Sequence, residues 1–349
     1  MTAKKFFTKE LLKWNKYDND RVMPWKYEKN PYKIWISEII LQQTRVSQGL
    51  EYYNRFIKRF PTVKSIAKAK ESEVFKLWEG LGYYTRCKNI IASAKYISEE
   101  LKGKFPEKYE DILKLKGIGS YTASAIASFA YNLPYAVLDG NVFRVLSRYF
   151  AIKIPIDNPQ GKIFYSNLAY ELLDKKLPGI YNQSIMDFGA TICKPLPLCS
   201  ECPLNPRCEA YLRGIQMQLP VKEKVILKKS RWLYYLVVKY ENKLYVRKRE
   251  EKDIWQNLYE FILIETPKLL TPEKLQKSDK FNSIFGENEI KIENISQVYK
   301  QHLTHQTING RFLTISVKSP LALNNYQLIS ADNIKQLPFP KFINTYLKD

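Results

Sequence analysis

The spacing of apolar residues changes character once along this 349-residue chain, and that change limits the folds it can adopt more than any other feature. Up to residue 213, apolar side chains recur at helical spacing, as Val74, Leu77, Trp78 and Leu81 do. After residue 230, β-branched and aromatic residues form short runs typical of strands. The sequence therefore predicts an all-α domain over 1–213, a linker over 214–230 and a strand-containing domain over 231–349.

Local signals predict where several elements lie. Asn30 followed by Pro31 is typical of a helix N-cap and first helical residue, and Ile36, Ile39 and Ile40 follow on one face. Further helices are expected over 74–81, 90–101, 109–114, 121–132, 142–149 and 163–173, and strands over 232–239, 243–249, 259–264 and 310–317.

The charge balance narrows the function classes. With 56 Lys and Arg against 35 Asp and Glu, a net charge of +21 favours a polyanionic partner, nucleic acid ahead of a membrane surface. No apolar run is long enough to span a membrane, and the first 14 residues do not resemble a signal peptide, so an intracellular protein is expected. The two histidines, His302 and His305, leave carboxylates, lysines and tyrosines for any earlier chemistry.

A glycine-containing turn lies between two predicted helices, in the sequence LKGIGSYTA that begins at Leu115. Gly117 and Gly119 would let backbone amides, and the helix that begins near Ser120, approach an anion without interference from a Cβ atom. The turn is therefore a candidate helix-hairpin-helix that holds a DNA phosphate, with an ordinary corner between two helices as the alternative.

Four cysteines form a second compact motif. Cys193, Cys199, Cys202 and Cys208 are spaced C-x5-C-x2-C-x5-C, with prolines between them. In an intracellular protein this density indicates a metal site rather than disulfides, and ligation by thiolates alone fits either an iron-sulfur cluster or zinc. Unliganded thiols are the remaining alternative. Cys87 lies apart, on a predicted helix, where it is expected to pack as a small side chain.

Two carboxylates stand out by their surroundings. Glu38 lies among apolar helical neighbours, where desolvation would raise its pKa and keep a proton available near neutral pH. Asp139 precedes a predicted helix. Taken alone, each has a simpler interpretation, a solvated helix face for Glu38 and a helix N-cap for Asp139.

Five motifs in order resemble the MutY-type adenine DNA glycosylases of the helix-hairpin-helix superfamily. They are RVMPWKYEKNPYKIWISEIILQQTRV, WEGLGYYTRCKNI, LKGIGSYTASAIASF, AVLDGNVFRVLSR, and NQSIMDFGATIC followed by three more cysteines. The later segments KREEKDIWQNLYEFI and HLTHQ resemble the C-terminal Nudix-like domain of that family.

The resemblance implies four catalytic residues. Glu38 would protonate the adenine leaving group, and Asp139 would stabilise or capture the sugar cation, as an oxocarbenium-like transition state requires. Tyr121 matches an active-site tyrosine, and Asn141 an asparagine near the attacking water. Because a phenol cannot form the Schiff base that a lysine forms at that position in related lyases, base removal without efficient strand cleavage is expected.

The resemblance also implies base-contacting residues on both sides of the mispair, where aromatic and amide groups can stack on bases and read their edges. They are Arg21, Trp25 and Gln183 around the adenine; Gln43, Thr44, Leu81 and Tyr83 at the gap and the 8-oxoguanine; and Leu303, Thr304 and His305 in the second domain. Core packing for Leu81 and Tyr83, and a solvated helix face for Gln43, are the alternatives.

The resemblance further implies the architecture, the cofactor and the partner. A six-helix module would span about 30–140, residues 1–29 and 141–213 would form an iron-sulfur module with one 4Fe-4S cluster, and an α+β Nudix-like domain would follow. The partner is double-stranded DNA with adenine opposite 8-oxoguanine or guanine, bound by a monomer in the nucleoid. The second domain lacks the glutamate-rich Nudix motif, so lesion recognition without hydrolase activity is expected. A bifunctional endonuclease III-like glycosylase/lyase and a non-catalytic DNA-binding scaffold are the competing functions.

Overall fold

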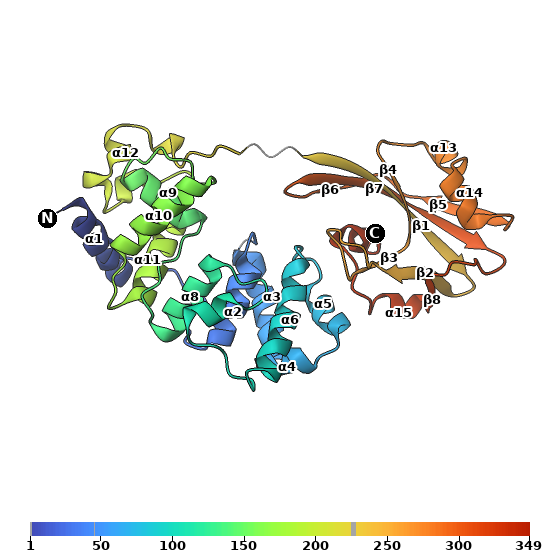
Figure 1. Ribbon diagram of the computed structural model, residues 1–349. Coiled ribbons are helices and arrows are strands. Elements are labelled where there is room, and N and C mark those ends of the chain that lie inside the picture. Colours follow the sequence, from blue (N-terminus) through green and yellow to red (C-terminus); the bar gives the residue numbers. More distant parts are fainter. Residues whose placement is uncertain (1, 45, 225–227) are drawn as a thin grey trace. The chain divides into compact units, whose positions relative to one another are not determined.

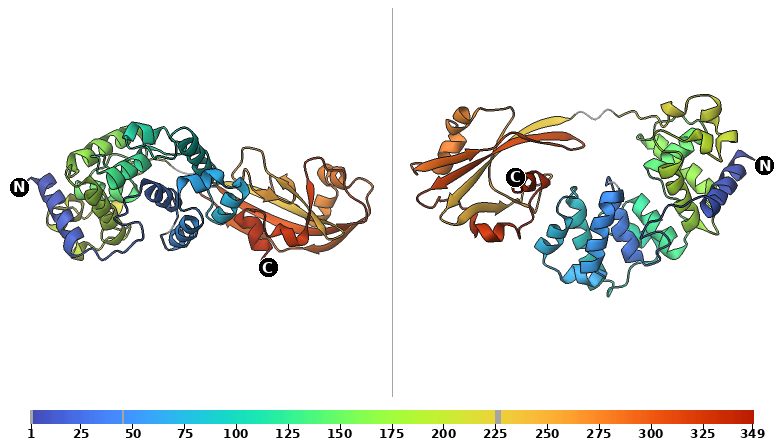
Figure 2. Two further views of the ribbon diagram at one scale, coloured as in Figure 1. Left: turned by 90° about the horizontal axis from the view of Figure 1, so that it is seen from below. Right: turned by 180° about the vertical axis from the view of Figure 1, so that it is seen from behind.

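The computed structural model describes residues 2–44, 46–224 and 228–349, and the chain divides into two compact units (Figure 1). Unit 1 comprises Met1–Lys68 and Asn89–Val225, and unit 2 comprises Ala69–Lys88 and Ile226–Asp349. Within the described residues, all strands belong to unit 2 (Figures 1 and 2). The expected order of a helical part followed by a mixed sheet is confirmed.

Unit 1 is built from helices joined by short loops. Its helices are α1 (Ala3–Tyr17), α2 (Pro31–Leu41), α3 (Val46–Arg59), α4 (Val63–Lys68), most of α6 (Thr85–Glu99), α7 (Tyr109–Leu113), α8 (Ser120–Tyr131), α9 (Gly140–Tyr149), α10 (Pro159–Leu172), α11 (Pro178–Thr191) and α12 (Glu209–Leu212). Short 3-10 helices lie at Cys199–Glu201, Asn205–Arg207 and Gln216–Gln218.

Helix α2 is buried along most of its surface, which matters for the site. Asn30 caps it by accepting hydrogen bonds from the amides of Tyr32 and Lys33, and Pro31 occupies its first turn. Its side chains from Ile34 to Ile40 are all buried, because α2 packs against both α3 and α8. A carboxyl group on this helix is therefore removed from water.

The glycine-containing turn joins α7 to α8. Gly117 has φ +81°, and a Cβ atom there would lie 2.6 Å from the Cβ atom of Asn89, so both the backbone and the packing require glycine. Gly119 is the N-cap of α8 with φ −95°, and a Cβ atom there would meet no other atom within 4 Å. The second glycine is therefore not required by anything inside unit 1.

A buried cluster of unit 1 joins its N-terminal helix to helices from much later in the chain. Phe7 and Trp14 of α1 pack with Tyr149 of α9 and Phe188 of α11 in one buried cluster. The N-terminal helix is thus fixed beside helices that lie more than 100 residues later in the chain.

Unit 2 contains a mixed sheet with helices around it. Its elements are α5 (Glu71–Trp78), β1 (Lys229–Tyr240), β2 (Lys243–Lys248), β3 (Tyr259–Glu260), β4 (Ile262–Thr266), α13 (Pro272–Gln276), α14 (Asp279–Phe285), β5 (Ile290–Ile295), β6 (Tyr299–His302), β7 (Gln306–Val317), β8 (Gln327–Ser330), α15 (Ala331–Ile334) and α16 (Lys341–Tyr346).

The long strands β1 and β7 run parallel at the centre of this sheet, in the order β3-β2-β1-β7-β5. Side chains of β1 alternate between two cores: Tyr234 and Leu236 pack with Phe281 and Phe285 of α14, whereas Tyr235 stacks with Phe312 of β7 near α16. Both faces of β1 are covered, which explains its nearly continuous apolar sequence.

Several predicted boundaries shift for local reasons. The helix predicted over 74–81 ends at Trp78, because Gly80 and Gly82 adopt left-handed φ angles. The strand predicted over 259–264 is divided into β3 and β4. Of the predicted linker, Leu219 is buried in unit 1 and its carbonyl accepts a hydrogen bond from Arg148, while residues 225–227 lie outside the described residues. No described helix is long and apolar enough to cross a membrane.

Candidate active site

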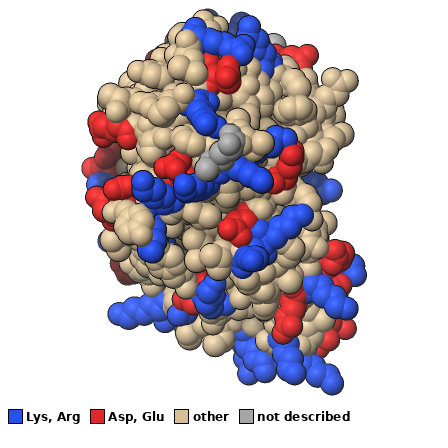
Figure 3. All heavy atoms as spheres, turned by 90° about the vertical axis from the view of Figure 1, so that its left-hand side faces the viewer, with Lys and Arg blue, Asp and Glu red and all other residues tan. Residues whose placement is uncertain are grey.

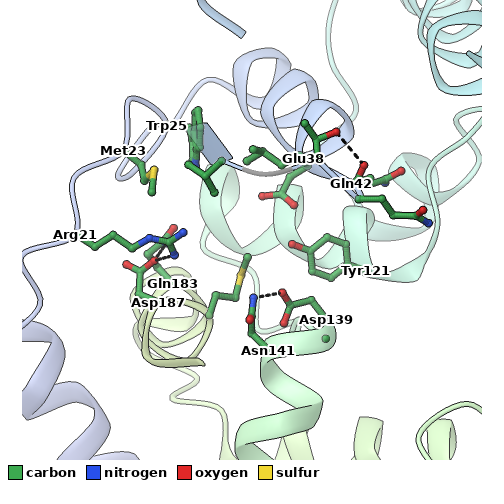
Figure 4. A pocket seen from close by; sticks show the side chains of 16 residues that line it. Arg21, Met23, Trp25, Glu38, Gln42, Tyr121, Asp139, Asn141, Gln183 and Asp187 are labelled. Atoms are coloured by element: carbon green, nitrogen blue, oxygen red, sulfur yellow. Dashed lines mark hydrogen bonds and ion pairs between the residues drawn. The ribbon is translucent and has the colours of Figure 1, made fainter. Parts of the chain in front are cut away.

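A cavity of about 480 Å³ opens in unit 1 where α2, α8, α9, α11 and the loop before α2 meet (Figure 4). All four residues with an expected catalytic role line it, together with five of the expected base-contacting residues. They are Glu38, Tyr121, Asp139 and Asn141, and Arg21, Trp25, Gln43, Thr44 and Gln183.

Glu38 is a buried acid that faces this cavity from α2. Burial raises its pKa to about 7, the Tyr121 hydroxyl lowers it by hydrogen bonding, and the negative charge of Asp139 raises it. A carboxyl group with this pKa is partly protonated at neutral pH, so it can donate a proton.

Asp139 faces the same cavity from the start of α9. It is the N-cap of that helix, and its Oδ1 accepts a hydrogen bond from the Val142 amide at 2.8 Å. Its Oδ2 accepts one from Asn141 Nδ2, also at 2.8 Å. Burial raises the pKa of Asp139 above its ordinary value, and these hydrogen bonds offset part of that increase. The N-cap interpretation and the active-site interpretation are thus compatible, because one oxygen caps the helix while the side chain lines the cavity.

Arg144 connects this carboxylate to the cysteine loop. Its Nη2 donates to Asn141 Oδ1 at 2.8 Å and to the Gly189 carbonyl at 2.6 Å, and its Nε donates to the Cys193 carbonyl at 2.7 Å. The Asn141 amide is therefore held with its nitrogen toward Asp139. Arg144 was not predicted as a site residue. The one feature that could have identified it is its place in the same motif as Asp139, five residues later.

Asp187 of α11 is a third carboxylate that lines the cavity, and it was not predicted from the sequence. Its side chain is fully buried and forms an ion pair with Arg21 at 2.7 Å. Lys26 Nζ lies 3.3 Å from its Oδ2, and Gln183 Nε2 donates to its Oδ1 at 3.0 Å. In the sequence, Asp187 is a single acid within the apolar run SIMDFG. Glu38 was identified by the same feature, an acid among apolar neighbours.

Two of the expected base-contacting residues follow α2 directly. Gln43, which has φ +57°, and Thr44 form the turn after that helix, beside Arg45, which lies outside the described residues. Both line the cavity next to Gln42, whose Nε2 donates to Thr122 Oγ1.

The other expected base-contacting residues belong to unit 2. Leu81 is buried, and Tyr83 is exposed in the turn before α6. Leu303, Thr304 and His305 form the turn between β6 and β7, where Thr304 and His305 are exposed. The Tyr83 hydroxyl and the Thr304 hydroxyl form a short hydrogen bond. Two segments separated by 221 residues are thereby brought together.

The four clustered cysteines surround one small apolar pocket with Ile192, Pro197 and Leu198. Arg148 crosses the loop, donating to the carbonyls of Lys194 and Pro195 and lying 3.6 Å from Cys193 Sγ. Among the described residues, no three His, Cys, Asp or Glu side chains converge on a point that would hold a single metal ion. Cys87 is fully buried, as expected for a packing residue.

Basic side chains are spread over the unit 1 face that carries α1 and α12, with acidic side chains among them (Figure 3). On this face the positive charge forms no single concentrated patch.

Comparison with protein families gives two matches. Residues 36–160 match the HhH-GPD superfamily of base excision DNA repair proteins, and residues 233–349 match a NUDIX domain. The first match contains Glu38, Tyr121, Asp139 and Asn141.

Curated relatives cover most of the chain. The adenine DNA glycosylase of Buchnera aphidicola subsp. Baizongia pistaciae is 36% identical over 91% of this chain and 89% of its own length. That of Buchnera aphidicola subsp. Schizaphis graminum is 41% identical over 78% of each chain, and the mouse adenine DNA glycosylase is 40% identical over 61% of this chain and 43% of its own length.

Two solved structures superpose on about three fifths of this chain. A thermostable thymine-DNA glycosylase superposes with a TM-score of 0.56 at 29% identity, covering 60% of this chain and 97% of its own. An endonuclease III trapped covalently on DNA superposes with a TM-score of 0.53 at 20% identity, covering 62% of this chain and 99% of its own, which shows a shared fold.

Proposed function

We propose that this chain, which belongs to the adenine DNA glycosylases, hydrolyses the N-glycosidic bond of adenine opposite 8-oxoguanine or guanine in duplex DNA. One observation carries the proposal: Glu38, with a pKa of about 7, and Asp139 line a single cavity. Its volume of about 480 Å³ is within the range of small-molecule sites and is suited to an extruded nucleoside.

Each carboxyl group supplies one of the two functions that this reaction needs. Glu38 donates its proton to the departing adenine, which leaves more readily as a neutral base. Asp139 holds negative charge beside the sugar, where positive charge develops in the oxocarbenium-like transition state. Asn141, fixed by Arg144, holds Asp139 Oδ2 in place.

The cavity supports base removal without strand cleavage. Lyase activity requires an amine that forms a Schiff base with the sugar, and the described residues that line the cavity include no lysine. Tyr121 stands beside Glu38, and its phenol forms no imine. This favours a monofunctional glycosylase over the bifunctional alternative, and the pair of acids argues against a non-catalytic scaffold.

The turn before α8 is suited to a DNA phosphate. Gly119 and Ser120 place the first amides of α8 at the surface, and nothing inside unit 1 occupies the space in front of Gly119. Gly117 sets the shape of the turn. Glu38 and Asp139 line one cavity of a single chain, so the proposed reaction requires no residue from a second copy.

Unit 2 provides a surface suited to lesion recognition. Tyr83 and Thr304, joined by their hydrogen bond, present an aromatic ring and a hydroxyl next to His305 and Leu303, and Leu81 is buried two residues before Tyr83. We infer that these groups contact 8-oxoguanine by stacking and hydrogen bonding. The absence of the glutamate-rich Nudix motif from the sequence supports recognition without pyrophosphate hydrolysis.

The donor chemistry of the cysteine loop fits a 4Fe-4S cluster. Cys193, Cys199, Cys202 and Cys208 surround one apolar pocket, and four thiolates are the donor set that such a cluster takes. When bound, the cluster takes the four thiolates as ligands and ties the loop together. Purified protein is expected to be brown and to contain about four irons per chain; colourless, zinc-containing protein would refute this assignment.

The experiment that tests the function is a single-turnover assay on duplexes with adenine opposite 8-oxoguanine. Strand breaks that arise only after alkali treatment support the proposal. Breaks without alkali would indicate a bifunctional lyase. Breaks in neither sample would indicate a binding protein without glycosylase activity.

A further inference from the structure

Asp187 is the lining residue whose contacts the proposed reaction does not use. Asp187 lies in α11, and its side chain is fully buried. Its two oxygens face four donors: Arg21 Nη1 at 2.7 Å and Gln183 Nε2 at 3.0 Å on Oδ1, and Asn19 Nδ2 at 3.1 Å and Lys26 Nζ at 3.3 Å on Oδ2. Two positive charges and two amides therefore surround one buried carboxylate.

The chemistry of these groups fixes the orientation of the Gln183 side chain. A carboxylate only accepts hydrogen bonds, so Gln183 must turn its NH2 group toward Asp187. The other branch of the carboxamide, Oε1, is an acceptor, and Gln183 is one of the residues that line the cavity (Figure 4). This orientation follows from the chemistry of the Asp187 carboxylate, which has no hydrogen-bond donor.

We propose that Asp187 is a positioning residue that sets base specificity, by making Gln183 present an acceptor, rather than a donor, to the extruded base. An acceptor matches the exocyclic amino group of adenine and rejects a purine with a carbonyl oxygen at the same position, such as hypoxanthine. A site built to hydrogen-bond one group discriminates strongly against an analogue that lacks it. This inference rests on the proposed function, because it concerns which base enters the same cavity.

Asp187→Asn tests the inference. The asparagine keeps the shape of the side chain but introduces a donor, and wherever that donor points, it faces groups that are themselves donors. When it points toward Gln183, the carboxamide of Gln183 turns over and presents its NH2 group to the cavity. The ratio of single-turnover excision rates for adenine over hypoxanthine, each opposite 8-oxoguanine, is expected to fall at least about tenfold.

Asp187→Glu is the matched variant. It overfills a buried position, so the absolute rate and the melting temperature are expected to fall, but the acceptor-only group remains. The adenine preference is therefore expected to stay within about threefold of wild type. A merely structural role predicts the opposite order, because asparagine is the better fit to the space.

Two further variants keep the inference testable if Asp187→Asn fails to fold. Gln183→Leu leaves the ion pairs of Asp187 in place and is expected to lose the adenine preference. Lys26→Met removes a cation from Oδ2 without touching Gln183, so it is expected to lower stability and to retain the preference.

The outcomes separate this inference from the proposed function. If wild-type protein excises no adenine from these duplexes, the proposed function fails. If wild type excises adenine while Asp187→Asn keeps the full preference over hypoxanthine, or Asp187→Glu loses as much of it as Asp187→Asn, the inference alone is overturned.

Discussion

At the scale of single residues, the Tyr121 hydroxyl adjusts the acidity of Glu38. Because its hydrogen bond lowers the pKa of Glu38, Tyr121→Phe is expected to raise that pKa above about 7. The proposed reaction needs protonated Glu38, so the alkaline limb of the pH–rate profile should move to higher pH. Tyr32→Phe is the control, since it removes a hydroxyl that donates to the Phe60 carbonyl. An unshifted limb in Tyr121→Phe would contradict this coupling.

The raised pKa of Glu38 also makes the stability of unit 1 depend on pH. A carboxyl group that titrates at about 7 when folded and at 4.5 when unfolded binds more protons in the folded state, so its contribution to stability falls as pH rises from 4.5 to 7. Glu38→Gln removes that dependence. At pH 8 it is expected to be more stable than wild type by on the order of 3 kcal/mol, and at pH 4 by much less. Denaturant unfolding at the two pH values measures the difference, and equal effects at both would contradict it.

Some residues of the candidate site could be predicted from the sequence, and others could not. The apolar neighbours of Glu38 indicated burial but left a solvated helix face as an alternative, whereas the position of Asp139 before a helix predicted its N-cap role. That the two acids share a cavity depends on how α2 packs relative to α9, which no local pattern encodes; only the family resemblance suggested it. Asp187 carried the same signal as Glu38, but three of its four donors, Asn19, Arg21 and Lys26, come from one segment far earlier in the chain.

At the scale of elements, the two glycines of the turn before α8 are expected to differ. Gly117→Ala should lower the free energy of unfolding by more than about 1 kcal/mol, because φ is +81° and the new Cβ atom would collide with Asn89. Gly119→Ala has open space and an ordinary φ, so it should unfold like wild type yet bind duplex DNA more weakly.

Thermal unfolding and a duplex-binding titration separate the two effects. Equal destabilisation by both substitutions would contradict the structural distinction between the glycines. Wild-type duplex affinity in Gly119→Ala would contradict phosphate binding at this turn.

Elements were predictable where capping and periodicity agreed. Asn30 and Pro31 fixed the start of α2, whereas α11 was not predicted because it is buried on several sides and shows no clear amphipathic spacing. The sheet order of unit 2 could not be predicted either, since β1 pairs in parallel with β7 across about 70 intervening residues.

At the scale of the whole molecule, we propose that excision chemistry uses residues of unit 1 and that lesion recognition uses residues of unit 2. Thr304→Val keeps the shape of the side chain but removes the hydroxyl that bonds to Tyr83. The preference for adenine opposite 8-oxoguanine over adenine opposite guanine is expected to fall about three- to tenfold. Excision from the guanine mispair should stay near the wild-type rate.

Single-turnover rates on the two duplexes measure this preference. Thr307→Val is the control, because Thr307 bonds to His302 on the neighbouring strand rather than to Tyr83. Equal losses on both duplexes would assign Thr304 to the stability of unit 2 instead of to lesion recognition.

Glu38 is proposed to donate a proton to the departing adenine, inside the cavity that it shares with Asp139. The most direct test is the single-turnover excision rate of Glu38→Gln on a duplex with adenine opposite 8-oxoguanine, measured together with duplex affinity. Loss of proton donation predicts a rate at least about 100-fold below wild type, with affinity within a few-fold. A rate near that of wild type would contradict the assignment of Glu38 as the acid.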